Sequence, residues 1–199
     1  MTKKSDEEEQ ELEEQEEDEV MFFPELPSEP VPRTIGVYGE IDESHAKTTL
    51  GALFALSTLD KEEPIDFLIS TEGGNVQDMF AIYDCVRDVR KTIDIHTFGI
   101  GKVMSAGVLL LAAGTKGKRR VGRHCRLMLH PVSGGHFGSI KELESDIREV
   151  RWYQEQFMKA IIEETKLDRR EIKKIFRKGS DTYFDADQAV EWGIADEVV

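Results

Sequence analysis

The sequence predicts an α/β domain with mainly parallel strands. Short apolar runs typical of strands alternate with longer segments of helical periodicity, and glycine or proline closes several of the strands. The length of 199 residues is sufficient for one domain with a sizeable core. In such a domain, functional residues are expected where strands end and loops begin.

The elements expected before residue 131 alternate regularly. They are strands at 34–38, 65–70, 93–98, 119–121 and 126–130, and helices at 44–59, 76–90 and 105–113. We find no internal repeat and no linker after residue 34, so this alternation predicts one domain.

The last third is expected to be mostly helical. Ser139 and Glu142 form the Ser-x-x-Glu pattern of a capping box, which opens a long helix. Apolar residues recur along this helix at helical spacing, and two aromatic residues broaden the stripe. The stripe consists of Leu143, Ile147, Val150, Phe157 and Ile161, with Trp152 and Tyr153 beside it. Similar start patterns at 168–171 and 185–188 predict two shorter helices, the second ending at Gly193.

Charge is concentrated at the N-terminus. Residues 1–19 hold 11 acidic residues and two lysines, a net charge of −9 out of −14 for the chain. Such a run repels itself and offers almost no apolar surface, so residues 1–20 are predicted to be a disordered acidic tail. The simplest role for this tail is a solubilising or interaction arm. Residues 21–33 form a proline-broken extended segment expected to pack on the body, and residues 34–199 form the domain.

Composition argues against several classes of protein. The one basic cluster, at 116–126, opens into a strand, so nucleic-acid binding is not expected. The apolar stretch 108–113 is far too short for a membrane span, and the acidic tail cannot form a signal peptide. Cys85 and Cys125 lack metal-ligand spacing and are expected to be reduced core residues, with no metal or cofactor. The sequence therefore predicts a soluble, cytoplasmic protein without a membrane partner.

Three residue types of a hydrolytic triad stand at the ends of predicted elements. Ser105 follows a glycine-rich turn and opens a buried helix, where unpaired N–H groups and the helix dipole favour developing negative charge. His130 ends a strand, and Asp181 precedes a short helix. A serine nucleophile needs a base, and the base needs an orienting carboxylate. Taken singly, such a serine is more often a helix cap, such a histidine more often structural, and such an aspartate a turn residue or cap.

Gly73 and Gly74 lie between the strand at 65–70 and the helix at 76–90. A glycine pair lets the backbone approach a ligand and present its N–H groups, although an ordinary tight turn would also use it. A second glycine-flanked turn, containing Ser105, follows one βα unit later. This arrangement is expected if one N–H from each turn contributes to an oxyanion hole.

Five motifs, in order, resemble those of ClpP, the proteolytic subunit family of the ATP-dependent Clp protease. They are STEGG at 70–74, GKVMSAG at 101–107, LLAAGTKGKR at 110–119, LMLHP at 127–131 and AVEWGIAD at 189–196. The resemblance runs from about residue 34 to residue 199, which makes it specific.

This resemblance implies a crotonase-like α/β fold and a serine endopeptidase that cuts unfolded polypeptides inside an oligomeric chamber through an acyl-enzyme. It puts the nucleophile on Ser105, the general base on His130 and the orienting acid on Asp181. It puts the oxyanion donors on the backbone N–H groups of Gly74 and Ala106.

The resemblance also implies an assembly of two stacked heptameric rings, joined by the helix at 139–165. The broad apolar stripe of this helix agrees with burial in a partner subunit, and core packing would explain it as well. An AAA+ unfoldase is the implied partner. However, residues 1–33 bear little likeness to the family's axial loop, so docking through that loop is not predicted. In this respect the chain resembles the ClpP-like proteins of tailed phages.

Two departures from the family lie beside the predicted site. Glu72 stands where proline usually precedes the glycine pair, and the turn before Ser105 reads Gly-Lys-Val-Met. Neither change removes a backbone donor, but Glu72 is expected to affect how a substrate strand lies beside the site.

Two other functions compete with the protease. One is a non-catalytic or latent ClpP-like ring component that acts as scaffold or regulator, because a complete triad held out of register would be inactive. The other is an acyl-CoA hydratase or isomerase, since crotonase-like enzymes also use paired N–H donors. That reading requires a carboxylate base, whereas the predicted site offers serine and histidine.

Overall fold

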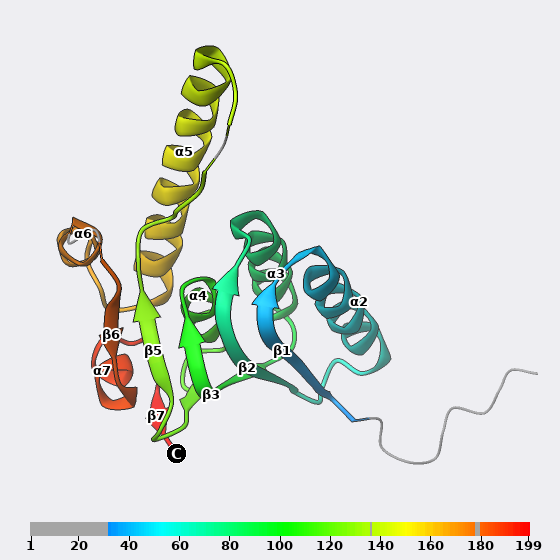
Figure 1. Ribbon diagram of the computed structural model, residues 1–199. Coiled ribbons are helices and arrows are strands. Elements are labelled where there is room, and N and C mark those ends of the chain that lie inside the picture. Colours follow the sequence, from blue (N-terminus) through cyan, green and yellow to red (C-terminus); the bar gives the residue numbers. More distant parts are fainter. Residues whose placement is uncertain (1–31, 136, 178–179) are drawn as a thin grey trace, which may run out of the picture. The chain divides into compact units, whose positions relative to one another are not determined.

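A seven-stranded sheet forms the centre of the computed structural model, which describes residues 32–135, 137–177 and 180–199 (Figure 1). The strands are β1 (Thr34–Ile41), β2 (Ile65–Gly74), β3 (Ile95–Met104), β4 (Arg120–Val121), β5 (Arg126–Leu129), β6 (Thr182–Phe184) and β7 (Glu197–Val198). Their order is β1-β2-β3-β4-β7, and β5 pairs with both β3 and β6. Every pair is parallel except β5–β6. The predicted α/β class with mainly parallel strands is confirmed.

Six helices accompany the sheet in the described residues. They are α2 (Glu43–Leu59), α3 (Val76–Val89), α4 (Ala106–Ala112), α5 (Ile140–Glu164), α6 (Arg169–Arg177) and α7 (Ala186–Glu191). Helix α4 lies against β2 and β3, α3 lies against α4, and α2 lies against α3 and β1. All seven residues of α4 are buried, so this short helix forms the centre of the core beneath the strand ends.

The predicted helix starts are confirmed by their caps. The Ser139 hydroxyl and the Glu142 side chain form the reciprocal bonds of a capping box at the start of α5. The Asp168 carboxylate accepts a hydrogen bond from the Glu171 N–H at 2.7 Å, ahead of α6. Asp185 caps α7 in the same way. These bonds satisfy N–H groups that have no partner within the helix.

Several strands are longer than predicted, which changes the surroundings of the site. Strand β2 runs to Gly74 and β3 runs to Met104, so the predicted glycine-rich turn before Ser105 is wrong. The glycines that suggested a turn lie inside β3, next to an irregularity in its register with β2. Glycine in a strand can mark a bulge as well as a turn, and the sequence does not distinguish the two. Strands β6 and β7 are too short to show a period of two and were not predicted.

Strand β3 is paired in two halves along one edge. Its first half pairs with β4, with Phe98 opposite Arg120, and its second half pairs with β5, with Lys102 opposite Arg126. Strand β5 then pairs with β6 in antiparallel fashion. The carboxyl ends of β3 and β5 and the start of β6 therefore meet at one edge of the sheet.

A buried ionic cluster fastens the C-terminal end of α5. The Glu164 side chain, only 2% exposed, accepts hydrogen bonds from Arg90 at 2.6 Å and from Lys116 at 3.0 Å. The Tyr83 hydroxyl also donates a hydrogen bond to this carboxylate, at 3.1 Å. Burial raises the pKa of Glu164, but the bonds from the two cations outweigh it and hold that pKa below its usual value. The cluster ties α5 to α3 and to the turn after α4.

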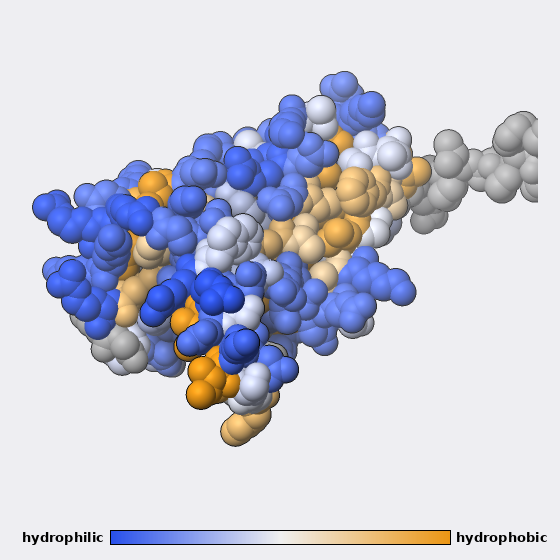
Figure 2. All heavy atoms as spheres, turned by 90° about the horizontal axis from the view of Figure 1, so that it is seen from above, coloured by the Kyte–Doolittle hydropathy of each residue, from blue (hydrophilic) through white to orange (hydrophobic). Residues whose placement is uncertain are grey.

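The apolar stripe of α5 divides into two parts. Phe157 and Ile161 are buried in the core, whereas Ile140, Ile147 and Trp152 are 76%, 51% and 52% exposed. The half that carries these exposed residues projects away from the sheet (Figure 1). Seen from above, the surface is mostly hydrophilic, with hydrophobic residues gathered in a few patches (Figure 2). Core packing therefore explains only the C-terminal half of the stripe.

Arg33 marks the start of the described domain. Its guanidinium donates hydrogen bonds to backbone carbonyl oxygens in the segment 56–64, at 2.8–3.1 Å. The predicted acidic tail and the proline-rich segment, apart from Pro32 and Arg33, lie outside the described residues. In the described part of the chain, no helix is long and apolar enough to cross a membrane.

The two cysteines lie where the sequence predicted. Cys85 and Cys125 are both free thiols buried in the core. Burial raises the pKa of Cys85 and raises the pKa of Cys125 to about 11, so both thiols are held in the protonated, unreactive form.

Candidate active site

Ser105 occupies a strained junction between β3 and α4. Its φ is 53° and its ψ is −118°, and among the described residues it is the one non-glycine residue with positive φ. Its N–H donates to the carbonyl oxygen of Met128 in β5 at 2.7 Å, which fixes the junction. Its side chain makes no capping bond to α4, so the interpretation of Ser105 as a simple helix cap is contradicted. Strain of this kind is typical of functional sites and points the hydroxyl away from the helix.

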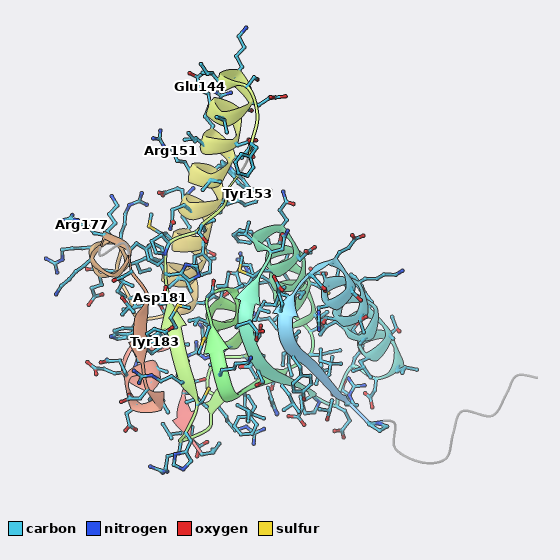
Figure 3. All side chains as sticks on the ribbon, in the orientation of Figure 1. Glu144, Arg151, Tyr153, Arg177, Asp181 and Tyr183 are labelled. Atoms are coloured by element: carbon cyan, nitrogen blue, oxygen red, sulfur yellow. The ribbon has the colours of Figure 1, made fainter. Side chains whose placement is uncertain are left out.

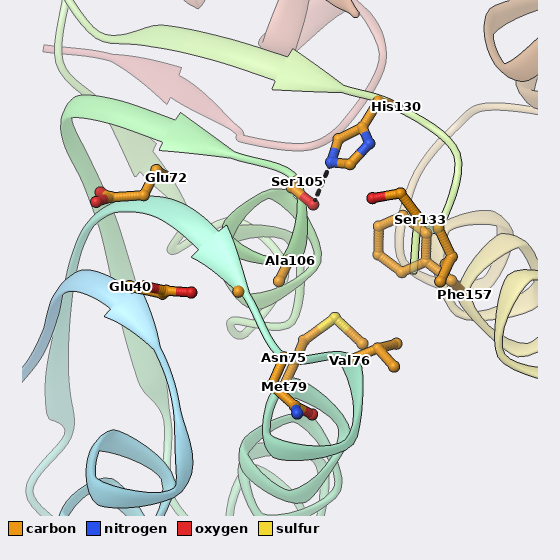
Figure 4. Close-up of a pocket in the computed structure, with 12 residues that line it drawn as sticks. Glu40, Glu72, Asn75, Val76, Met79, Ser105, Ala106, His130, Ser133 and Phe157 are labelled. Atoms are coloured by element: carbon orange, nitrogen blue, oxygen red, sulfur yellow. Dashed lines mark hydrogen bonds between the residues drawn. The ribbon is translucent and has the colours of Figure 1, made fainter. Parts of the chain in front are cut away.

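The hydroxyl of Ser105 is directed at His130. A hydrogen bond of 2.9 Å joins Ser105 Oγ to His130 Nε2 (Figure 4). His130 follows the last residue of β5, and β5 pairs with the end of β3, so the two strand ends bring the groups together. A serine and an imidazole at this distance have the geometry that a nucleophile and its general base require.

Asp181 and His130 lie at the same end of the β5–β6 ladder. In the antiparallel pair, Leu129 stands opposite Thr182. His130 and Asp181 are the next residues on each side, one beyond the paired segments. Sequence reasoning could not foresee this, because β6 was not predicted.

The carboxylate of Asp181 has a different partner, however. It accepts a hydrogen bond of 3.3 Å from the Tyr183 hydroxyl, and the two side chains lie together at the start of β6 (Figure 3). Within the described residues, no hydrogen bond or ion pair joins Asp181 to His130. The structure thus brings two of the three predicted triad residues into contact, and the third lies at the same end of the β5–β6 ladder without a bond to the histidine.

The glycine pair beside Ser105 is required by its surroundings. Gly73 has a φ of +99°, and a methyl group on it would lie 2.6 Å from Ser105 Cβ. Gly74 has a φ of +153°, and a methyl group there would lie 2.1 Å from the carbonyl oxygen of Ile41. Neither position can hold a side chain in this geometry.

One N–H of the glycine pair is already used inside the protein. The Gly73 N–H donates to the buried Thr71 hydroxyl oxygen at 2.9 Å, which leaves Gly74 as the candidate oxyanion donor of the pair. Ala106 is the first residue of α4, so its N–H has no acceptor within the helix. Both residues line the same cavity as Ser105 and His130.

This cavity, of about 390 Å³, has an apolar and an acidic side. Met79, Val132 and Phe157 supply apolar surface, and Phe157 comes from the buried end of α5. Glu40 and Glu72 lie on the other side of Ser105 (Figure 4). Sequence reasoning missed these lining residues except Glu72, because they come from three elements and the loop after β5, which only the fold brings together. The site therefore contains carboxylates as well as serine and histidine.

Glu72 is paired within the chain. Its carboxylate lies 2.6 Å from Lys102 Nζ, and the bond from Lys102 lowers the pKa of Glu72. Both residues belong to the segments where the sequence departs from the ClpP pattern, so the two departures are joined by one ion pair. Among the described residues, no group of three or more metal-ligand side chains could hold a metal ion.

Comparison with known proteins finds relatives over most of the chain. The family model described as Clp protease matches residues 29–199. The chain is 34% identical over 160 residues to ATP-dependent Clp protease proteolytic subunit 2 of Thermobifida fusca (strain YX), covering 80% of this chain and 77% of that protein. It is 32% identical over 168 residues to proteolytic subunit 2 of Chlamydia pneumoniae and to proteolytic subunit 1 of Chlamydia felis (strain Fe/C-56). Each of these alignments covers 84% of this chain and 80% of the relative.

Proposed function

Because this chain belongs to the Clp protease family, we propose that it is a serine endopeptidase in which Ser105, His130 and Asp181 form the triad. The observation that carries the proposal is the 2.9 Å bond between Ser105 Oγ and His130 Nε2, in a cavity also lined by Gly74 and Ala106. This combination offers a nucleophile, a base and two backbone donors around one space.

The chemistry follows from these positions. His130 Nε2 takes the Ser105 proton as Oγ attacks the carbonyl carbon of the substrate. The carbonyl oxygen becomes an oxyanion that accepts hydrogen bonds from the N–H groups of Gly74 and Ala106. The intermediate collapses, the C–N bond breaks, and His130 returns the proton to the leaving amine. Water, activated by His130, then hydrolyses the acyl-enzyme and restores Ser105.

Asp181 has the orienting role in this scheme. His130 and Asp181 each lie one residue beyond the paired strands, at the same end of the β5–β6 ladder, so we propose that the carboxylate turns from Tyr183 to Nδ1 of the imidazole. A carboxylate there holds the ring in the productive tautomer and stabilises the imidazolium that forms. We therefore expect Asp181→Asn to lower kcat strongly, by about 10⁴-fold.

Intact-protein mass spectrometry with a fluorophosphonate probe tests the proposal. We expect one adduct per chain in the wild type, and none in Ser105→Ala. Ser133→Ala is the matched control, because Ser133 lines the same cavity without a bond to His130 and its variant must still form the adduct. An adduct that persists in Ser105→Ala would refute the assignment of the nucleophile.

A latent ring component is the second candidate function. The observation that favours it is the bond of Asp181 to Tyr183 in place of His130. A protein that assembles, binds peptides and forms no adduct would support this candidate. If the adduct formed only after a partner protein was added, the chain would be a protease that becomes active on assembly with that partner.

An acyl-CoA hydratase would use a carboxylate base, and Glu40 and Glu72 bring carboxylates to the cavity. The Ser105–His130 bond supports acyl transfer instead, since hydration needs no such pair. Hydration of crotonyl-CoA by the wild type, unchanged in Ser105→Ala, would reverse this choice.

The proposed enzyme works as a homo-oligomer on unfolded polypeptides. The uncovered apolar half of α5 supports burial against another copy of the chain, in heptameric rings stacked in pairs. Native mass spectrometry measures the ring size. The relatives named above are called ATP-dependent, and stimulation of protein degradation by an AAA+ unfoldase with ATP tests whether this chain shares that dependence.

A further inference from the structure

Glu40 lies at a defined distance from the nucleophile. In the sheet register Glu40 stands opposite Gly73, and Gly73 in turn packs against Ser105. Neighbouring strands are about 4.8 Å apart, so the backbones of Glu40 and Ser105 are about 10 Å apart across β2. An extended peptide advances about 3.3 Å per residue. Glu40 therefore stands two or three peptide residues from the reacting carbon.

The two carboxylates of the cavity differ in their availability. Glu72 points away from Ser105 and is neutralised by Lys102 at 2.6 Å, whereas the Glu40 carboxylate points into the cavity (Figure 4). Glu40 has no ion pair or side-chain hydrogen bond within the described residues, and no lysine or arginine is among the described residues that line the cavity. The negative charge of the Glu40 carboxylate is thus available to bind a positively charged group of a ligand.

We propose that Glu40 is a specificity-determining residue that favours peptide substrates with lysine or arginine two or three residues from the scissile bond. The inference rests on the proposed protease function. Met79, Val132 and Phe157 provide apolar surface for a neighbouring side chain of the same peptide. The preferred substrate class is therefore a peptide with an apolar residue near the cleaved bond and a cation farther along. Glu40 is exposed, so the preference is moderate, about threefold to fivefold in kcat/KM.

A set of fluorogenic peptides tests the assignment. Each peptide keeps one apolar residue at the cleaved bond and carries lysine, alanine or glutamate at one position up to three residues to either side. The measured quantity is the lysine-to-alanine ratio of kcat/KM. We expect a ratio of about 3–5 at one position in the wild type, about 1 in Glu40→Gln, and below 1 in Glu40→Lys. The wild-type ratio should shrink in 0.5 M NaCl, because salt screens exposed charges.

Glu62→Gln is the matched control, because Glu62 is an exposed glutamate that lines a different cavity. This variant should keep the wild-type ratio. A wild-type ratio of 1 at every position, or an unchanged ratio in Glu40→Gln, would overturn the role of Glu40. The protease proposal would still stand in that case if the fluorophosphonate probe labels Ser105. If neither labelling nor hydrolysis occurs, the protease proposal fails by itself. Fluorescence anisotropy of the same peptides bound to Ser105→Ala then decides: a lysine preference that depends on Glu40 supports the inference, and equal binding overturns it.

Discussion

Gly73→Ala should inactivate the site without unfolding the domain. The added methyl group would lie 2.6 Å from Ser105 Cβ and 3.2 Å from Ser105 Oγ. An ordinary contact begins at 3.4 Å, so Ser105 must move by about 0.8 Å relative to Gly73. A displacement of about 1 Å in a catalytic group costs about 100-fold in rate. We therefore expect kcat/KM to fall about 100-fold.

Backbone strain needs a control of its own, and Gly117→Ala provides it. Gly117 has a φ of +84°, close to the +99° of Gly73, but a methyl group there would meet no atom within 4 Å. Both variants should lose about 1–3 kcal/mol of stability from the positive φ. At about 3 °C per kcal/mol, that loss lowers Tm by about 3–9 °C. Gly117→Ala should nevertheless keep its activity.

Peptide hydrolysis, fluorophosphonate labelling and thermal unfolding would be measured on the three proteins. The expected pattern is a similar fall in Tm for both variants and a loss of hydrolysis and labelling in Gly73→Ala alone. If Gly73→Ala keeps kcat/KM within threefold of the wild type, the close approach of Gly73 does not set the position of Ser105. The same result would remove the steric reason for glycine at this place.

Three further predictions concern the ionic cluster, the thiols and the acid of the triad. Because folding lowers the pKa of Glu164, the unfolded state takes up this proton at a higher pH than the folded state does. The ionised Glu164 therefore contributes to the free energy of unfolding above about pH 4.3, and this contribution is lost as the pH falls below that value. Glu164→Gln should lower the free energy of unfolding, measured with urea, by about 3 kcal/mol at pH 7. Between pH 5 and 3 the free energy of unfolding should fall less steeply in the variant than in the wild type, and an equal fall in both proteins would contradict this. Iodoacetamide at pH 8 should leave Cys85 and Cys125 unmodified until urea is added, since burial raises both pKa values; rapid labelling of the folded protein would disprove their burial. Tyr183→Phe should raise the rate of Ser105 labelling up to about fivefold, because Asp181 loses the partner that competes with His130, and an unchanged or lower rate would show that the bond does not restrain the acid.

The sequence predicted the features that depend on local patterns. The alternation of elements, the capping box at Ser139 and the buried cysteines are visible over a few residues, and the structure confirms them. Ser105 was chosen because it opens a predicted helix and His130 because it ends a predicted strand, and the sheet brings them to hydrogen-bonding distance.

Other features depend on contacts between distant segments. The pairing of β5 with β6 brings Asp181 and His130 to the same end of one ladder, and three residues of β6 carry too little periodicity to be recognised. Glu40 reaches the site because β1 runs three residues farther than predicted, through a register irregularity at Gly39, and a single glycine does not tell a bulge from a turn. The bond from Tyr183 to Asp181 is likewise a matter of side-chain geometry.

The β5–β6 ladder also has a consequence for the order of folding. It joins segments more than 50 residues apart with three residue pairs, whereas β1, β2 and β3 are linked by single helices. Closing so long a loop is entropically unfavourable, so this ladder should form after the local βα units. During synthesis, Ser105 and His130 also emerge well before Asp181. On the proposed function, an immature subunit carries the nucleophile before its acid partner, and nearby nascent chains are spared until the subunit is complete.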